Sequence, residues 1–109
     1  MEETVTLYRI CRTSPPTAED LRSYAALGIP LRGDSPEMRR LATGISVFGS
    51  LERARKQAKG KPWLGDAFLA ELVIPTGQFQ VEKTGGRDHY TLWGDAHAIL
   101  RYVRSVEPV

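Results

Sequence analysis

The stretch from Gly44 to Ala58 reads GISVFGSLERARKQA and decides how the middle of the chain folds. It predicts a short buried strand over 45–48, a break at Gly49, and a helix that starts after Ser50, because serine is a preferred N-cap residue. A strand that runs directly into a helix presents backbone N–H groups beside a small hydroxyl. Such a junction at the mouth of a cleft can hold a nucleotide phosphate or an amide, so it is the first candidate site.

Length and composition point to one ordinary folded domain. The 109 residues are enough for a single core, so we expect one domain over 1–109. The net charge of +2 is too small to predict nucleic-acid binding from bulk charge. Cations do gather in the middle of the sequence, which predicts one basic side; they are Arg39, Arg40, Arg53, Arg55, Lys56, Lys59 and Lys61.

Cysteine usage and the ends of the sequence bear on location. Cys11 is the only cysteine, which excludes an internal disulfide and favours a reducing compartment. Because it lies in an apolar run without a nearby His or Asp, we interpret it as a buried structural thiol. The first residues are acidic, and no apolar run approaches the ~20 residues of a membrane span. The sequence therefore predicts a cytoplasmic protein with no membrane association.

The pattern of apolar and turn residues predicts an α+β domain with a mostly antiparallel sheet and three to four short helices. Strands are expected at 5–12, 45–48, 68–74, around Phe79 and Val81, at 89–93, and at the edge over 103–106. Both faces of the 68–74 strand are mostly apolar, which is typical of a strand inside a sheet.

Four helices are expected, each with a start signal. One follows Thr17, with a capping box closed by Asp20 and an apolar stripe of Leu21, Tyr24, Ala25 and Leu27, and it ends at Gly28. A second starts at Ser35 with Pro36 in its first position and Met38, Leu41 and Ala42 on its inner face. The third spans 51–59, with Leu51, Ala54 and Ala58 inside. Asp95 caps the last, which carries Ile99, Leu100 and Val103.

Several common chemistries lack their motifs. His89 and His97 stand eight apart without paired cysteines, so zinc-ligand spacing is absent and no metal site is expected. The sequence has no Gly-x-Ser-x-Gly elbow and no Gly-x-x-x-x-Gly-Lys-Ser/Thr phosphate loop. These absences remove the most familiar hydrolase and nucleotide-triphosphate classes.

Three polar features remain inside predicted strands. Arg9 needs an anionic or hydrogen-bonding partner if it is buried, Ser46 interrupts an apolar strand, and 88–95 gathers titratable, hydroxyl and aromatic groups. Each also has a purely structural interpretation: a solvent-facing or salt-bridged arginine, a hydroxyl on the open face of the sheet, and a core Trp93 beside a hydrogen-bonded His89.

At these residues the chain resembles the ADP-ribosyltransferase family. Tyr8-Arg9 on a first strand is similar to the Tyr-Arg or Tyr-His pair that opens many such domains. The run from Gly44 to Phe48, followed by Ser50 and Ala54, looks like their second motif. The segment from Glu71 to Gly77 resembles the strand and turn of small bacterial members such as rifampin-modifying transferases. The likeness spans about residues 5–82.

The resemblance implies NAD as cofactor. Tyr8 and Arg9 would then hold its ribose or phosphates, and a guanidinium suits both. Ser46 would line the nicotinamide-ribose pocket, with Phe48 available for stacking and Ser50 at the helix start. The expected cleft lies between Arg9 and Ser46. Catalysis would cleave the nicotinamide–ribose bond and transfer ADP-ribose to water or to a protein or nucleic-acid acceptor.

One family feature is missing. These enzymes place a Glu or Asp on a late strand to stabilise the positive charge of the transition state. Here Asp88 and Asp95 are the nearest candidates. The RNA 2′-phosphotransferase branch uses Arg and His instead, which Arg87 and His89 fit. The expected catalytic residues are therefore Arg9, Ser46, His89 and Asp88, and they are required to converge on one cleft.

Two other functions stay open. A non-catalytic interaction module would use the basic face of the 51–59 helix, formed by Arg53, Arg55, Lys56 and Lys59, to bind an acidic protein or a nucleic-acid backbone in a salt-sensitive way. A small hydrolase would be built on His89 with Asp88 or Asp95.

Overall fold

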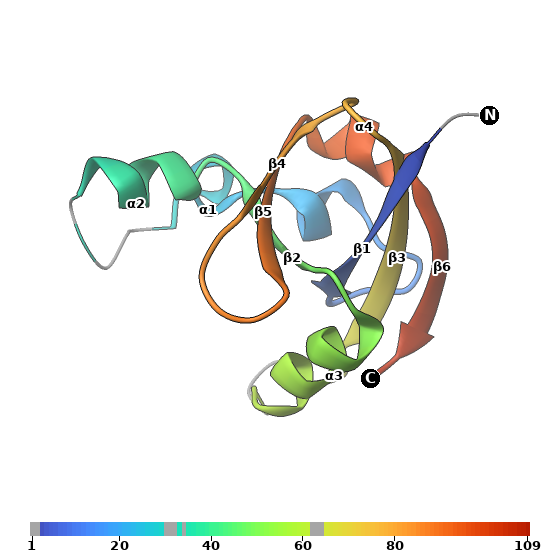
Figure 1. The fold of residues 1–109 in the computed structure, drawn as a ribbon. Coiled ribbons are helices and arrows are strands. Elements are labelled where there is room, and N and C mark those ends of the chain that lie inside the picture. The colour runs from blue at the N-terminus through green and yellow to red at the C-terminus, as the bar shows by residue number, and fades with distance from the viewer. Residues whose placement is uncertain (1–2, 30–32, 34, 62–64) are drawn as a thin grey trace.

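A computed structural model describes residues 3–29, 33, 35–61 and 65–109. Its centre is one six-stranded sheet in the order β4-β5-β2-β1-β3-β6, in which every neighbouring pair is antiparallel (Figure 1). The strands are β1 Thr4–Cys11, β2 Ile45–Phe48, β3 Phe68–Pro75, β4 Gln80–Lys83, β5 His89–Trp93 and β6 Val103–Pro108. The predicted α+β fold with a mostly antiparallel sheet is confirmed.

Five short helical segments lie among the described residues. They are the 3₁₀ helix η1 Ala18–Leu21 and the α-helices α1 Tyr24–Leu27, α2 Pro36–Leu41, α3 Leu51–Lys59 and α4 Ala96–Leu100. Helix α3 follows β2 directly, and helices α1 and α2 extend away from the sheet as an arm (Figure 1). We call residues 23–29 and 35–42 the α1–α2 arm. Among the described residues, no helix is long and apolar enough to cross a membrane.

The two faces of the sheet are covered differently. On one face, which we call the η1–α4 face, Leu7, Val47, Leu72 and Leu92 pack with Leu21 of η1 and with other buried side chains, including Ile99 of α4. On the opposite face, the α3 face, a smaller cluster joins Phe48 and Leu69 to Ala54 and Ala58 of α3. Successive residues of a strand alternate between these faces, so strand register fixes which cluster each side chain joins.

The strand-to-helix junction over Gly44–Ala58 folds as predicted. Strand β2 covers 45–48, and Ser50 caps α3 by accepting a hydrogen bond from the Arg53 N–H at 3.2 Å. Gly49 follows the last residue of the strand, and its N–H donates to the Asp88 carbonyl at 2.8 Å, which extends the register of β2 with β5 by one position. Ala54 and Ala58 are buried against the sheet, so the predicted inner face of this helix is confirmed.

The first predicted helix is wrong in its continuity and in its apolar face. It is two segments, because Arg22 is extended and Ser23 starts a new helix by accepting from the Ala26 N–H at 3.1 Å. Leu21 is buried, whereas Tyr24 and Leu27 are 58% and 40% exposed. These two side chains belong to the projecting arm, which the sequence pattern could not distinguish from a helix on the core.

The second and last helices differ from expectation in smaller ways. Ser35 caps α2 and Pro36 is its first residue, as predicted, but Met38 is 40% exposed and does not face the core. Asp95 caps α4 by accepting from the Ala98 N–H at 3.1 Å. Val103 lies in β6 instead of on α4, because the helix ends at Leu100 and the edge strand begins three residues later.

Arg40 fastens the arm to the sheet. Its guanidinium bonds Glu37 on its own helix and Glu82 on β4, and it lies 5.2 Å from the centroid of the Trp93 ring. The Trp93 indole N–H donates to Thr43 Oγ1 at 2.9 Å. Trp93 is therefore a half-buried contact between the arm and β5, where the structural interpretation of the sequence expected a core residue.

The burial of Leu92 and the exposure of Leu27 predict very different effects of alanine substitution on the free energy of unfolding. Leu92→Ala removes a fully buried side chain at the centre of the η1–α4 face and is expected to lower the free energy of unfolding by about 2–5 kcal/mol. Leu27→Ala changes an exposed residue of the arm and is expected to stay within about 0.5 kcal/mol. Urea unfolding followed by circular dichroism measures both, and equal effects would contradict this assignment of the core.

Candidate functional site

Arg9 lies where β1 and β2 separate. Strand β1 pairs with β3 along its whole length but with β2 only at Tyr8–Phe48. Just past that pair, Arg9 Nη1 donates to the Ser46 carbonyl at 2.8 Å, and Nε donates to the Asp20 carbonyl at 3.0 Å. A side chain thus makes the connection that a regular ladder would make with backbone groups.

The guanidinium of Arg9 is held by carbonyls and not by a carboxylate. Among the described residues it forms no ion pair, and its second terminal nitrogen, Nη2, makes no hydrogen bond. Desolvation by burial lowers the pKa of Arg9, although the nearby Cys11, Tyr24 and Asp20 act in the opposite direction. The result is a desolvated cation with N–H capacity left for an anionic or polar ligand.

Asp20 is a carboxylate whose charge acts on this arginine, and its oxygens already accept hydrogen bonds. They accept hydrogen bonds from the N–H groups of Arg12 at 2.9 Å and Thr17 at 3.1 Å, and from the Thr13 hydroxyl. Partial burial acts to raise the pKa of Asp20, but these hydrogen bonds and the charge of Arg9 outweigh it and the pKa is lowered. An ionised carboxylate therefore stands beside Arg9 on the η1–α4 face.

Ser46 does not share a face with Arg9. The side chains of Tyr8 and Phe48 point to the α3 face, and alternation along β2 places Ser46 there too. Arg9 points to the η1–α4 face, between Leu7 and Cys11. The two side chains do not line one cleft as expected, because the register of β1 and β2 sets them in opposite directions. What reaches Arg9 is the backbone carbonyl of Ser46, whose exposed hydroxyl fits the open-face interpretation.

Tyr8 and Phe48 are engaged in packing on the α3 face. Phe48 is 6% exposed, contributes to the cluster under α3, and meets the His89 ring edge-on at 5.4 Å between centroids. The Tyr8 hydroxyl donates to Glu71 Oε2 at 3.4 Å, and its pKa is raised by desolvation and by the Glu71 charge. The stacking surface expected of Phe48 is therefore taken up by the protein itself.

Ser50, Asp88 and His89 come together at the end of β2 and β5. Asp88 adopts a left-handed φ of 53°, and its Oδ2 lies 3.5 Å from Ser50 Oγ. His89 Nδ1 lies 2.7 Å from the Thr84 carbonyl, so Nδ1 carries the proton. The side chain of His89 shares the α3 face with Phe48. These residues form one group, separate from Arg9.

Cys11 is fully buried, as the sequence predicted. Desolvation raises the pKa of its thiol to about 12. Because only the thiolate is an effective nucleophile, this cysteine has a structural role. Among the described residues, no group of three or more His, Cys, Asp or Glu side chains is arranged to hold a metal ion.

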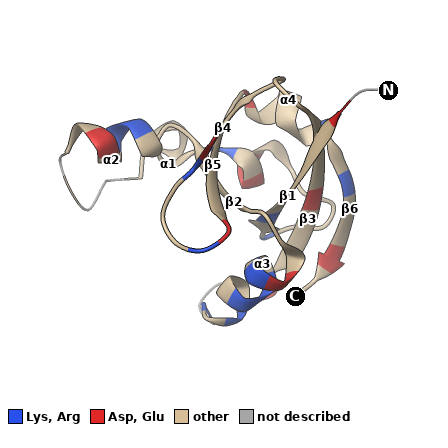
Figure 2. Ribbon diagram, in the orientation of Figure 1, with Lys and Arg blue, Asp and Glu red and all other residues tan. Residues whose placement is uncertain are grey.

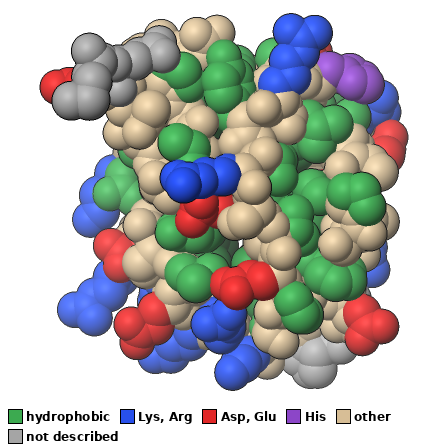
Figure 3. Space-filling view, turned by 90° about the vertical axis from the view of Figure 1, so that its right-hand side faces the viewer, with side chains coloured by type: hydrophobic (Ala, Val, Ile, Leu, Met, Phe, Trp, Pro, Cys, Tyr) green, Lys and Arg blue, Asp and Glu red, His purple; other side chains and the backbone are tan. Residues whose placement is uncertain are grey.

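The cations expected on one basic side are divided between two places. Arg39 and Arg40 are on α2, whereas the others are on α3 or just after it (Figure 2). On α3, Arg55 forms an ion pair with Glu107 at 3.1 Å, and the buried Nε of Arg53 has no hydrogen-bond partner among the described residues. Seen from the side of β6, acidic and basic side chains are interspersed (Figure 3). The expectation of a single basic side stays a prediction.

Comparisons with known proteins add nothing to this geometry. No protein-family model matches the chain, and neither a curated protein nor a solved structure does. The candidate site therefore rests on the residues themselves.

The hydrogen bonds to Asp20 predict a pH-dependent contribution to stability. Since the pKa is lowered in the folded state, the contribution is complete above the ordinary value of 3.8 and is lost as the pH falls through the folded-state pKa. Asp20→Asn is expected to be less stable than the wild type at neutral pH, with a difference that shrinks below about pH 4.

Denaturant unfolding across this pH range measures the difference. Asp66→Asn is the control, because Asp66 is exposed and makes no hydrogen bond to the described residues. A constant difference between wild type and Asp20→Asn down to pH 2.5 would show that the carboxylate bonds do not stabilise the fold.

Proposed function

We propose that this protein binds NAD, or a closely related nucleotide, on the η1–α4 face at the opening between β1 and β2. The observation that carries the proposal is Arg9, a desolvated cation at that opening with no carboxylate partner among the described residues and with Nη2 free of hydrogen bonds to them. A guanidinium with a free N–H edge is a strong partner for a phosphate, since charge-assisted hydrogen bonds are about twice as strong as neutral ones.

The resemblance at Tyr8-Arg9 and over Gly44–Ala54 supports NAD over other nucleotides. In this proposal Arg9 holds the diphosphate or a ribose hydroxyl. Ser46 takes part through its carbonyl, which fixes the guanidinium at 2.8 Å. Phe48 and Ser50 support the site from the opposite face of the sheet. Phe48 packs under α3, and Ser50 caps the start of that helix. Tyr8 also supports the site from the α3 face, where its hydroxyl donates a hydrogen bond to Glu71.

Transfer of ADP-ribose is a further part of the hypothesis. Breaking the nicotinamide–ribose bond develops positive charge on the ribose, which a nearby carboxylate stabilises. On the face of Arg9 that carboxylate is Asp20, whose lowered pKa keeps it ionised. Asp88 and His89, predicted as catalytic, belong to the other group of residues, so we expect their substitution to affect NAD binding less than that of Arg9.

A thermal-shift titration with NAD tests the binding. NAD is expected to raise the Tm of the wild type. At an NAD concentration of a hundred times Kd, binding adds about 2.7 kcal/mol to the free energy of unfolding. Arg9→Ala, measured against its own unliganded Tm, is expected to show no shift. Arg101→Ala is the matched control, because this arginine is exposed and makes no ion pair with the described residues.

Two results would overturn the proposal. One is a folded wild type with no shift at millimolar NAD, and the other is an Arg9→Ala variant with an undiminished shift. Because Arg9 also ties two backbone segments together, Arg9→Lys serves as a second variant. Lysine keeps the positive charge but lacks the planar set of N–H groups of a guanidinium. Equilibrium dialysis is expected to find NAD binding weaker by about tenfold or more.

A further inference from the structure

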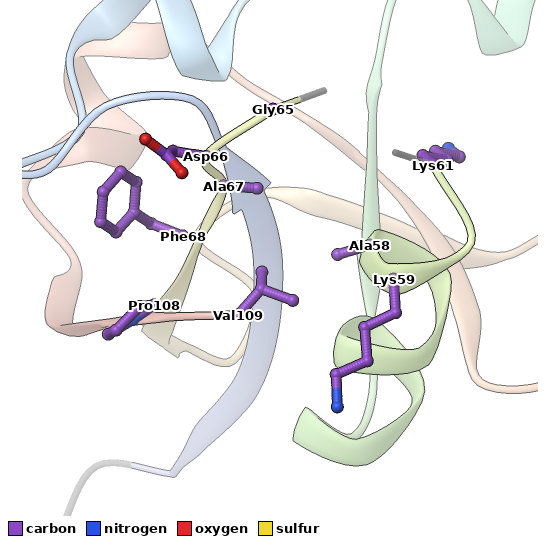
Figure 4. A pocket seen from close by; sticks show the side chains of 9 residues that line it. All are labelled: Ala58, Lys59, Lys61, Gly65, Asp66, Ala67, Phe68, Pro108 and Val109. Atoms are coloured by element: carbon purple, nitrogen blue, oxygen red, sulfur yellow. The ribbon is translucent and has the colours of Figure 1, made fainter. Parts of the chain in front are cut away.

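Two open hollows follow the outer side of α3, and Lys59 lines both. The first, of about 440 Å³, lies between the end of α3, residues 65–68 and the last two residues of the chain (Figure 4). The apolar side chains that point into it are Ala58, Ala67 and Val109 (Figure 4). The second, of about 560 Å³, runs beside Leu51, Arg55 and Lys56. Because they share Lys59, the two hollows form one surface, which we call the α3 groove.

The α3 groove carries more positive than negative charge. Lys56, Lys59 and Lys61 make no ion pair with any described residue. Arg55 is neutralised by Glu107, and the groove also contains the carboxylates of Glu52 and Asp66. The floor of the groove is apolar. Its rim holds separate lysines, with the carboxylates of Glu52 and Asp66 between them.

We propose that the α3 groove docks an extended acidic segment of a partner protein. Carboxylates of the segment pair with Lys56 and Lys59 on the rim, and an apolar side chain of the segment lies against Ala58, Ala67 and Val109. Apolar contact gives affinity, and the complementary charges select the partner and orient it.

The chemistry of the groove favours a protein segment over a nucleic acid. Single strands bind by stacking bases on aromatic side chains along a continuous basic track. Here Phe68 is the one aromatic residue among those that line the two hollows, and its ring points away from α3 (Figure 4). Glu52 and Asp66 interrupt the cations and would repel a uniformly charged backbone, whereas a peptide can place its carboxylates opposite the lysines.

This inference does not depend on NAD. The groove belongs to the outer side of α3, which covers the face of the sheet opposite to Arg9. Nucleotide binding and docking can therefore succeed or fail separately, and Arg9→Ala is expected to leave docking unchanged.

Fluorescence anisotropy with a short labelled peptide that alternates Glu and Leu tests the proposal. The full chain is expected to bind it, and the double variant Lys56→Glu/Lys59→Glu to bind at least about tenfold more weakly. The matched control is Lys83→Glu, an exposed lysine on the opposite edge of the sheet, with less than about twofold change. Val109→Ala, checked for folding by circular dichroism, is expected to weaken binding severalfold and so separates docking from charge attraction alone.

Three outcomes would overturn the proposal. They are no binding of the Glu-Leu peptide, equal binding of a matched Lys-Leu peptide, and tighter binding of single-stranded oligothymidine that is lost in the same double variant. The last would identify the groove as a nucleic-acid surface.

Discussion

The hydrogen bonds of Arg9 hold together parts of the structure that the sheet ladder leaves apart. Strands β4, β5 and β2 form one antiparallel half and β1, β3 and β6 the other, and between the halves the register gives only the Tyr8–Phe48 pair. Arg9 bridges the halves through the Ser46 carbonyl and draws in η1 through the Asp20 carbonyl. A half-buried guanidinium loses part of its hydration, and these two carbonyls replace the lost hydrogen bonds.

The same arrangement gives the two faces of the sheet different capacities. On the α3 face, helix α3 closes the junction between the halves by packing Ala54 and Ala58 against Phe48 and Leu69. On the η1–α4 face, Arg9 and the ionised Asp20 stand together, and one N–H edge of Arg9 makes no hydrogen bond to the residues that the structure describes. One face therefore holds an arginine beside an ionised carboxylate, while on the other face the outer side of α3 offers a mixed apolar and basic surface.

Local sequence signals predicted the elements whose determinants are local. Strand β2, the cap at Ser50 and helix α3 follow from a few adjacent residues, and so does β5. The break at Ser23 was missed because the apolar spacing from Leu21 to Leu27 continues across it. Whether a helical stripe faces the core is decided by tertiary position, so Tyr24, Leu27 and Met38 could not be placed from spacing alone.

In the candidate site, too, local sequence predicted which residues matter, whereas tertiary position decides how they meet. Sequence reasoning selected Arg9 and Ser46 and predicted that Arg9 needs a partner, and the two residues do meet. That they meet through a backbone carbonyl follows from the register between strands about forty residues apart, which no local pattern encodes. Asp20 was recognised only as a capping residue. Its place beside Arg9 depends on how η1 packs against β1.

The most direct test of this account is a map of backbone amide chemical shifts in ¹⁵N-labelled protein during titration with NAD. We expect the largest changes at Arg9, Asp20 and Ser46, which meet at the opening between β1 and β2, with the amides of α3 little affected. Changes centred on Ser50, Asp88 and His89, or none at saturating NAD, would contradict the central role given to Arg9.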